Sequence, residues 1–219
     1  MSLAEIAADT GIARSSVYRL IDALVEIELV EQLADSRVRL SRRWLRLADA
    51  AVLGFTEWTG AQGVLDDLAR AVGLTAFLTV LENDRATCVF WAQSSGIDLL
   101  ELRPGRSLPL NAGAAGRCFL AFDDEVASRL IDTEEWPVFT DRTLADAEAL
   151  WEDVRLSRDR GYVLSDEDVT AGIGALGVPL WRGGRLVGCL SVAGLAEVLR
   201  RDQRELADRA RATAENLLR

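Results

Sequence analysis

The chain has 219 residues and a formal net charge of −10, and its 25 basic residues are all arginine, with no lysine and no histidine. The absence of histidine excludes a Ser-His-Asp triad, a Cys-His pair and every histidine-ligated metal site. A hydrophobic content of 49% allows one large or two small domains with real cores. Cys88, Cys118 and Cys189 are odd in number and far apart, which indicates reduced thiols in a cytoplasmic protein. The sequence shows no signal-like segment and no apolar run long enough to span a membrane.

Residues 2–30 predict a helix-turn-helix. Apolar side chains recur at helical spacing on both sides of Gly11, which permits the positive φ that the turn requires. Ala7 is small enough to let two helices cross closely, and Val17 would pack back between them. We expect the second helix to span Ala13–Glu26 and to enter a major groove of DNA. The candidate contacts on this helix are Arg14, Ser15, Ser16, Tyr18 and Arg19.

Two short strands are predicted directly after this helix. Leu29–Leu33 and Arg37–Leu40 flank a short turn, so we interpret residues 1–42 as a winged helix-turn-helix DNA-binding domain. Arg37 and Arg39 would then face the phosphate backbone of double-stranded operator DNA. A helical hairpin that packs on another element is the alternative interpretation.

The charge of this segment is compatible with DNA binding. Residues 1–48 carry seven arginines and seven acidic residues, so the whole net charge of −10 falls on the rest of the chain. Arginine on the surface of a neutral segment is a weaker indication than a basic domain would be. A winged helix domain normally has another helix before these two, and this sequence starts without it. We therefore expect Leu3 and Ile6 to be partly uncovered.

Residues 43–59 predict a helix that follows the wing, with Ser41 as its N-cap. Its apolar stripe consists of Trp44, Leu45, Leu47, Ala48, Ala51, Val52 and Phe55. We interpret this segment as a linker helix that pairs with its copy in a homodimer. An ordinary core helix fits the pattern equally well.

Residues 60–219 predict a second domain of the α+β class, with an antiparallel sheet flanked by helices. The expected strands are Thr75–Leu81, Ala86–Ala92, Leu99–Arg103, Gly161–Ser165, Ala175–Trp181 and Arg185–Ala193. The expected helices are Val64–Val72, one entered from the small-residue loop within Ser107–Phe122, Asp123–Asp132, Leu144–Arg160 and Glu197–Leu218. Gly183 and Gly184 mark a hairpin between the last two strands.

Three segments resemble, in order, the conserved segments of IclR-type transcriptional regulators. They are SLAEIAADTGIARSSVYRLIDALVEIELVE, LRPGRSLPLNAGAAGRCFLA and RGYVLSDEDVTAGIGALGVPLWRGGRLVGCLSVAG. The resemblance covers essentially the whole chain and lacks only the family's first DNA-binding helix. It implies an N-terminal winged helix-turn-helix, a GAF-like effector-binding domain, and a homodimer that is often a dimer of dimers. It implies neither a cofactor nor a membrane partner.

The resemblance also implies a cavity for a small carboxylic or aromatic metabolite. Matched by position, its lining includes Leu110, Ala114, Ala115, Ala175, Ser191 and Ala193. On physical grounds, the backbone N–H groups of Ala114, Ala115 and Gly116 lie at a helix N-terminus, where a carboxylate is stabilised. Asn111 and Ser191 would add hydrogen bonds. Aromatic walls are available from Phe77, Phe90 and Trp91.

The chain departs from the family pattern in ways that affect this cavity. Asn111 stands where histidine is usual, Arg117 replaces a common lysine, and Ser165 stands where the first of two acids is often found. Ala175 and Ala193 occupy positions that are Cys and Ser in some relatives with hydrophilic effectors. We therefore expect a less polar pocket and a larger, more apolar or aromatic effector.

Each remaining candidate has a plain structural alternative. Asp166, Glu167 and Asp168 form a solvated loop more readily than a metal or acid–base cluster, since no histidine or paired cysteine supports a metal. Cys118 fits a buried small hydrophobe better than a reactive thiolate. Ser191 is equally well a satisfied core hydroxyl.

These residues predict a ligand-responsive DNA-binding regulator. Its alternatives are an enzyme, which lacks a credible base or nucleophile here, and a dimeric sensor or co-regulator that does not bind DNA.

Overall fold

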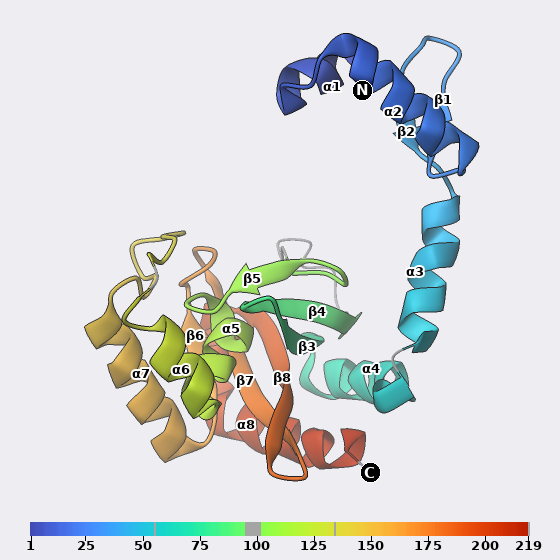
Figure 1. The fold of residues 1–219 in the computed structure, drawn as a ribbon. Coiled ribbons are helices and arrows are strands. Elements are labelled where there is room, and N and C mark those ends of the chain that lie inside the picture. The colour runs from blue at the N-terminus through green and yellow to red at the C-terminus, as the bar shows by residue number, and fades with distance from the viewer. Residues whose placement is uncertain (55, 95–101, 134, 219) are drawn as a thin grey trace. The chain divides into compact units, whose positions relative to one another are not determined.

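A computed structural model describes residues 1–54, 56–94, 102–133 and 135–218. The chain divides into two compact units, Met1–Thr59 and Gly60–Arg219, which we describe separately (Figure 1). Among the described residues, no helix combines the length and the apolar character that a membrane crossing requires.

The first unit begins with the two predicted helices. Helix α1 (Leu3–Thr10) starts at Ser2, whose hydroxyl accepts the N–H of Glu5 while the Glu5 carboxylate accepts the N–H of Ser2. This reciprocal capping box satisfies two backbone donors at the helix start. The helix ends at Gly11, which has a φ of 68°, and helix α2 (Arg14–Glu26) follows after a short turn.

The wing consists of the antiparallel strands β1 (Val30–Gln32) and β2 (Val38–Leu40). The start of the chain lies beside β2, because the Val38 N–H donates to the Met1 carbonyl at 2.8 Å. The small core of this unit is formed by Leu3, Val17, Ile21, Val30 and Val38. Our expectation that Leu3 is partly uncovered is therefore wrong, since this packing leaves it 8% exposed.

Helix α3 (Arg43–Gly54) follows the wing and is tied to it at its start. The Ser41 hydroxyl accepts the Arg43 N–H at 3.1 Å, as expected of an N-cap, and itself donates to the Glu28 carbonyl. The Trp44 indole N–H donates to the Leu29 carbonyl at 2.8 Å. A short 3-10 turn, η1 (Thr56–Trp58), completes the unit.

The second unit is built on a six-stranded antiparallel sheet with the strand order β5-β4-β3-β8-β7-β6. The strands are β3 (Thr75–Glu82), β4 (Arg85–Ala92), β5 (Ser107–Pro109), β6 (Val163–Asp166), β7 (Ile173–Arg182) and β8 (Arg185–Leu195). The predicted hairpins β3–β4 and β7–β8 are present. Strand β5 was not predicted, since Ser107–Pro109 had the composition of a loop. The strand expected at Leu99–Arg103 lies mostly outside the described residues.

Helices cover both faces of this sheet (Figure 1). Helices α4 (Ala61–Val72) and α8 (Ala196–Leu217) pack on one face, and α5 (Gly113–Phe122) packs on the other. Helices α6 (Asp124–Leu130) and α7 (Ala147–Arg160) pack against α5. The unit therefore has the predicted α+β architecture, with α5 as its central helix.

Two glycines let α5 approach its neighbours closely. A Cβ atom at Gly116 would lie 2.5 Å from the Pro109 carbonyl oxygen, and one at Gly177 would lie 3.1 Å from the Ala114 carbonyl oxygen. The contact at Gly116 is too close for any side chain, so this position requires glycine, whereas a Cβ at Gly177 would fit only if its neighbours shifted slightly. The close packing places the first turn of α5 against strands β7 and β8.

Candidate functional sites

The predicted DNA contacts of the first unit lie on the outer surface of α2. Arg14, Ser15, Ser16, Tyr18 and Arg19 are all exposed, while Val17 between them is buried. Within the described part of the chain, neither Arg14 nor Arg19 forms an ion pair. Their guanidinium groups are therefore available to phosphates and base edges, which is the chemistry that a recognition helix uses.

The two wing arginines are held differently. Arg37 forms an ion pair with Asp35 at 2.7 Å, and Arg39 forms one with Glu31 at 2.8 Å. Hydrogen bonds from these arginines lower the pKa of the Asp35 and Glu31 carboxyls. Both arginine side chains remain more than half exposed, at 58% and 56%. A DNA phosphate would have to compete with, or share, these carboxylate partners.

The second unit contains a cavity of about 60 Å³ between the first turn of α5, strands β6, β7 and β8, and the loop after β6. Six of the residues expected at an effector site line it: Ala114, Ala115, Ser165, Ala175, Ser191 and Ala193. Its other lining residues are Phe77, Leu102, Leu108, Gly113, Val169, Thr170, Ile173 and Gly174. The walls are mainly apolar, and Phe90 and Trp91 are not among them.

Three expected site residues lie elsewhere. Leu110 is fully buried in the core under α5. The Asn111 amide donates to the carbonyls of Pro137 and Leu144 at 3.0 and 2.8 Å, so it fastens the loop before α7. Gly116 packs against the backbone of residues 109 and 110.

A small set of polar groups reaches the cavity. Ser191 is 3% exposed, and its hydroxyl has no hydrogen-bond partner among the described residues. Ala114 and Ala115 place their N–H groups at the start of α5, where a helix lacks internal acceptors. These donors suit an anionic or carbonyl-bearing ligand. The alternative, in which the Ser191 hydroxyl is hydrogen-bonded within the core, is not supported, because no described residue bonds to it.

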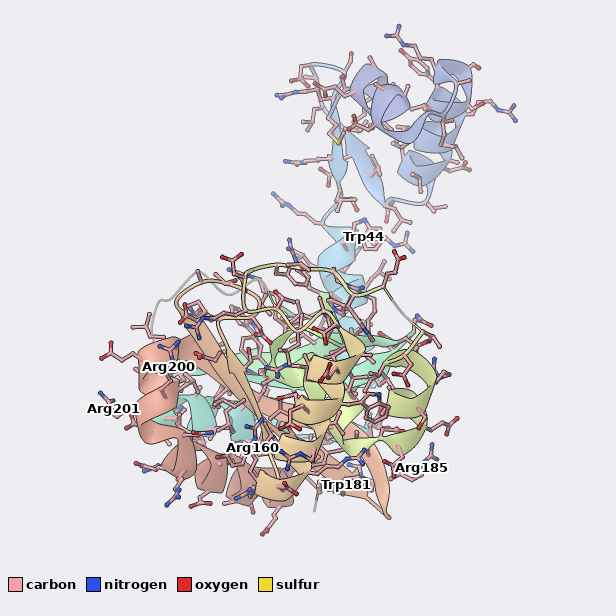
Figure 2. The ribbon with its side chains drawn as sticks, turned by 90° about the vertical axis from the view of Figure 1, so that its left-hand side faces the viewer. Trp44, Arg160, Trp181, Arg185, Arg200 and Arg201 are labelled. Atoms are coloured by element: carbon pink, nitrogen blue, oxygen red, sulfur yellow. The ribbon has the colours of Figure 1, made fainter. Side chains whose placement is uncertain are left out.

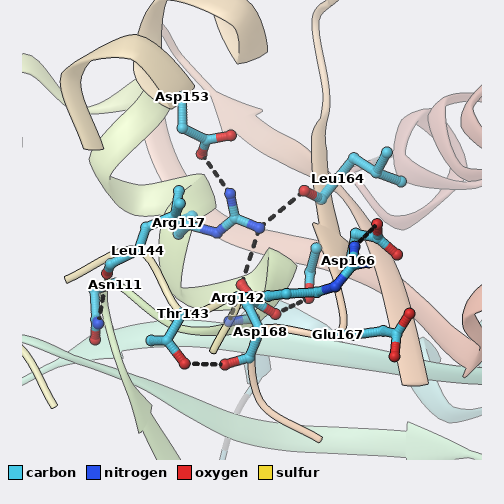
Figure 3. A network of polar contacts seen from close by, with 12 residues as sticks. Asn111, Arg117, Arg142, Thr143, Leu144, Asp153, Leu164, Asp166, Glu167 and Asp168 are labelled. Atoms are coloured by element: carbon cyan, nitrogen blue, oxygen red, sulfur yellow. Dashed lines mark hydrogen bonds and ion pairs between the residues drawn. The ribbon is translucent and has the colours of Figure 1, made fainter. Parts of the chain in front are cut away.

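A buried ionic network adjoins the cavity (Figure 3). Arg117, 4% exposed, binds the Asp168 carboxylate at 2.9 Å and the Asp153 carboxylate at 2.8 Å. Asp168 is 2% exposed and also accepts hydrogen bonds from the Ser165 hydroxyl and from the Gly113 N–H. The expectation of a solvated loop is therefore wrong for Asp168. Its burial is stabilised by Arg117, whose charge four residues into α5 was the available signal in the sequence.

The two acids before Asp168 are closer to the surface. Arg142 binds Asp166 at 2.9 Å, and Arg200 binds both Asp166 and Glu167. Hydrogen bonds from the Gly172 N–H and from Arg200 lower the pKa of Glu167. Figure 2 shows Arg200 beside Arg201 at the start of α8. The Asp166–Asp168 segment is therefore held by ion pairs on two sides: the exposed Arg142 and Arg200 bind its first two acids, and the buried Arg117 binds Asp168.

The cysteines are buried thiols rather than nucleophiles. Burial raises the pKa of Cys88 to about 12, and burial together with the neighbouring Cys189 raises that of Cys118 well above its usual value. All three cysteines are free and buried. In the described residues, no cluster of three or more His, Cys, Asp or Glu side chains could hold a metal ion.

Together, the exposed recognition helix, the wing and a separate unit with a small cavity define a DNA-binding transcriptional regulator. The family model "Bacterial transcriptional regulator IclR C-terminal" matches residues 58–219, and the IclR helix-turn-helix model matches residues 1–34. The chain belongs to the IclR family of bacterial transcriptional regulators, and its relatives are regulators rather than enzymes.

Similar proteins agree with this assignment. The chain is 26% identical to the HTH-type transcriptional regulator XynR of Escherichia coli, over 95% of this chain and 83% of that one. It is 32% identical to the HTH-type transcriptional regulator Rv1719 of Mycobacterium tuberculosis, over 82% of this chain and 69% of that one.

Solved structures share the fold. An IclR regulator from Alicyclobacillus acidocaldarius matches with a TM-score of 0.85 and 25% identity, over 99% of this chain and 89% of that one. An IclR homologue from Microbacterium hydrocarbonoxydans, solved in complex with 4-hydroxybenzoate, matches with a TM-score of 0.85 and 21% identity, over 100% and 91% of the two chains.

Proposed function

We propose that this regulator binds operator DNA as a homodimer and that a small carboxylic acid, held in the cavity of its second unit, controls its affinity for DNA. In this proposal residues 1–42 bind DNA, residues 43–59 form the linker helix, and residues 60–219 bind the effector. The observation that carries the proposal is the cavity. It combines donors that have no partner among the described residues, from Ser191 and the first turn of α5, with apolar walls.

The contacts to the DNA bases would come from α2 and those to the DNA phosphate backbone from the wing. The residues on α2 are Arg14, Ser15, Ser16, Tyr18 and Arg19, and those of the wing are Arg37 and Arg39. Two copies of α2 would enter successive major grooves, about 34 Å or a multiple apart.

Helix α3 supports a dimer, because Trp44, Leu45 and Leu47 are 43%, 73% and 42% exposed in the single chain. Effector binding would change the spacing of the two recognition helices. By linkage, DNA then alters effector affinity by the same factor.

The walls of the cavity favour an apolar or aromatic acid over a two- or three-carbon acid. Its volume of about 60 Å³ is smaller than the ~300–1,000 Å³ typical of sites for drug-sized ligands. A cavity of this size favours a compact effector over the larger one expected from the sequence, and a ring-bearing acid would require its walls to move apart. The complex of a structural neighbour with 4-hydroxybenzoate is in keeping with this class. Calorimetry with benzoate and phenylacetate against glyoxylate and pyruvate tests the ligand class, and tighter binding of the small acids contradicts it.

Fluorescence anisotropy with DNA from the region upstream of the gene tests the DNA-binding part. We expect binding that exceeds that of scrambled DNA and weakens steeply with salt, because phosphate contacts release counterions. Arg19→Ala should lose about 1–3 kcal/mol of binding free energy. Arg204→Ala, which removes an exposed arginine from α8 in the second unit, serves as the matched control.

Two outcomes would change the assignment. Equal affinity of Arg19→Ala and the parent chain would remove Arg19 from the contact set. Absence of DNA binding, repeated with a longer N-terminal segment, would favour a dimeric sensor or co-regulator that does not itself bind DNA. That alternative draws on one observation, namely that the wing arginines are already paired with acids.

A further inference from the structure

Two serines line the same cavity but differ in what their hydroxyls can offer a ligand. Ser191, on β8, has no partner in the described chain, so its hydroxyl can donate or accept. Ser165, on β6, is bonded to the Asp168 carboxylate. The two residues sit on opposite sides of β7, paired with Gly177 and Ala175 respectively.

The proton of the Ser165 hydroxyl is committed to Asp168. Asp168 forms an ion pair with the buried Arg117, and the carboxylate of such a pair can only accept hydrogen bonds. Ser165 must therefore be the donor in the Ser165–Asp168 bond. No N–H or O–H of the described chain donates to the Ser165 oxygen in return. Toward the cavity, Ser165 is an acceptor only.

This acceptor lies beside the donors at the start of α5. One oxygen of Asp168 accepts from Ser165, and the other accepts from the Gly113 N–H at 3.2 Å. Ser165 is therefore close to the first turn of α5, which carries the N–H groups of Ala114 and Ala115. Because Ser165, Ala114 and Ala115 line the same cavity, a ligand whose carboxylate binds these N–H groups would bring the atoms next to its carboxyl carbon toward the Ser165 oxygen.

We propose that Ser165 is a specificity-determining residue that selects 2-hydroxy acids over their 2-oxo and unsubstituted analogues. The inference rests on the proposed acid-binding function of the cavity. A 2-hydroxyl group can donate a hydrogen bond to the Ser165 oxygen. A 2-oxo group is itself an acceptor, so it would face the Ser165 oxygen without a hydrogen bond. A 2-ammonium group would also donate, but its charge would have no free carboxylate in this apolar cavity, because Asp168 is already paired with Arg117.

Arg117 and Asp168 act as positioning residues in this scheme. They do not contact the ligand, since neither lines the cavity. Arg117 holds the Asp168 carboxylate in place through their ion pair, and Asp168 orients the Ser165 hydroxyl. A 2-oxo acid could pair with Ser165 only if the hydroxyl turned away from Asp168, which would leave a buried carboxylate with one donor fewer.

The test is calorimetry of the full chain with three acids that share one skeleton: mandelate (each enantiomer), phenylglyoxylate and phenylacetate. We expect the preferred enantiomer of mandelate to bind about tenfold more tightly than the other two acids, the gain of one well-placed hydrogen bond. In Ser165→Ala the ratio should fall to near one. In Ser191→Ala, which removes a hydroxyl that is free to donate to any carboxylate, all three affinities should fall by a similar factor and the ratio should persist.

The outcomes separate this inference from the function on which it rests. If phenylglyoxylate or phenylacetate binds as tightly as mandelate, or if Ser165→Ala keeps the preference, the role of Ser165 is overturned while the acid-binding function stands. If none of the three acids binds, the proposed ligand class fails and the inference falls with it. A thermal melt of each variant, with a Tm equal to that of the parent chain, excludes loss of folding as the cause of a changed ratio.

Discussion

The two units of this regulator use the same kind of ion pair in opposite settings. In the first unit, Arg39 and Glu31 are joined at 2.8 Å with side chains 56% and 37% exposed. In the second, Arg117 and Asp168 are joined at 2.9 Å with side chains 4% and 2% exposed. The bond lengths are nearly equal, so the difference lies in the solvent around them.

The difference in exposure gives the two ion pairs different functions. An exposed pair contributes little to stability, because water and salt screen it, and its arginine can exchange a carboxylate for a phosphate at small cost. A buried pair cannot exchange partners in this way, because each ion would be left without solvation. The wing arginines are therefore suited to reversible DNA contacts, whereas Arg117 and Asp168 are suited to holding a binding site in one geometry.

The largest predicted effect is the loss of stability in Asp168→Ala. This change leaves Arg117 with Asp153 as its ion-pair partner and the Leu164 carbonyl as a neutral acceptor, and it also removes the acceptor of Ser165 and Gly113. Breaking a buried pair by removing one partner typically costs about 3–5 kcal/mol. The measurement is the free energy of unfolding from urea denaturation of the parent chain and the variant.

The matched control is Asp84→Ala, which breaks an exposed pair of the same chemistry. Arg129 donates two hydrogen bonds to Asp84, at 2.6 and 2.7 Å, and both side chains are nearly half exposed. The loss should be far smaller than for Asp168→Ala. Comparable losses in the two variants would show that burial does not set the strength of these pairs.

The next effect is a loss of stability in alkaline solution. Burial raises the pKa of Cys88 to about 12 and that of Cys118 well above its usual value, so both thiols stay protonated in the folded chain. The unfolded chain releases these protons near pH 8.5. Stability is therefore fully present below that pH and falls as pH rises toward the folded-state values, by up to about 1.4 kcal/mol per pH unit for each thiol.

The composition leaves few other groups that titrate in this pH range. The chain has no lysine and no histidine, so the three cysteines and two tyrosines are its main side-chain titrations between pH 8 and 11. Urea unfolding across this range should give a slope that decreases in Cys88→Ala. An unchanged slope in that variant would assign the alkaline effect to other groups.

Local patterns predicted much of this fold because they are properties of neighbouring residues. Helical spacing identified α2, and the Gly183–Gly184 turn identified the hairpin of β7 and β8. Strand β5 was missed because its three residues hold their conformation by pairing with β4, a contact that the local sequence does not encode.

The candidate sites show the same limit. The exposed face of α2 follows from periodicity, and six of nine expected effector residues line the cavity. The charge of Arg117 on an apolar helix signalled a buried acid, but three adjacent acids look alike in sequence and only the fold shows that Asp168 is the one that reaches it. Asn111 was expected at the cavity for its hydrogen bonds, and it makes them with the Pro137 and Leu144 carbonyls instead.

The smallest predicted effect tests the exchange of partners in the wing. Glu31→Gln removes the charge that competes with DNA for Arg39 while keeping a side chain of similar shape. Affinity for operator DNA should rise roughly two- to threefold at low salt and return toward the parent value at high salt, as expected of a screened surface interaction. Glu152→Gln, which removes one of the two carboxylates paired with Arg155 on α7, should leave DNA affinity unchanged because α7 belongs to the second unit. A Glu31→Gln variant with unchanged affinity at both salt concentrations would indicate that Arg39 stays with its own wing when DNA binds.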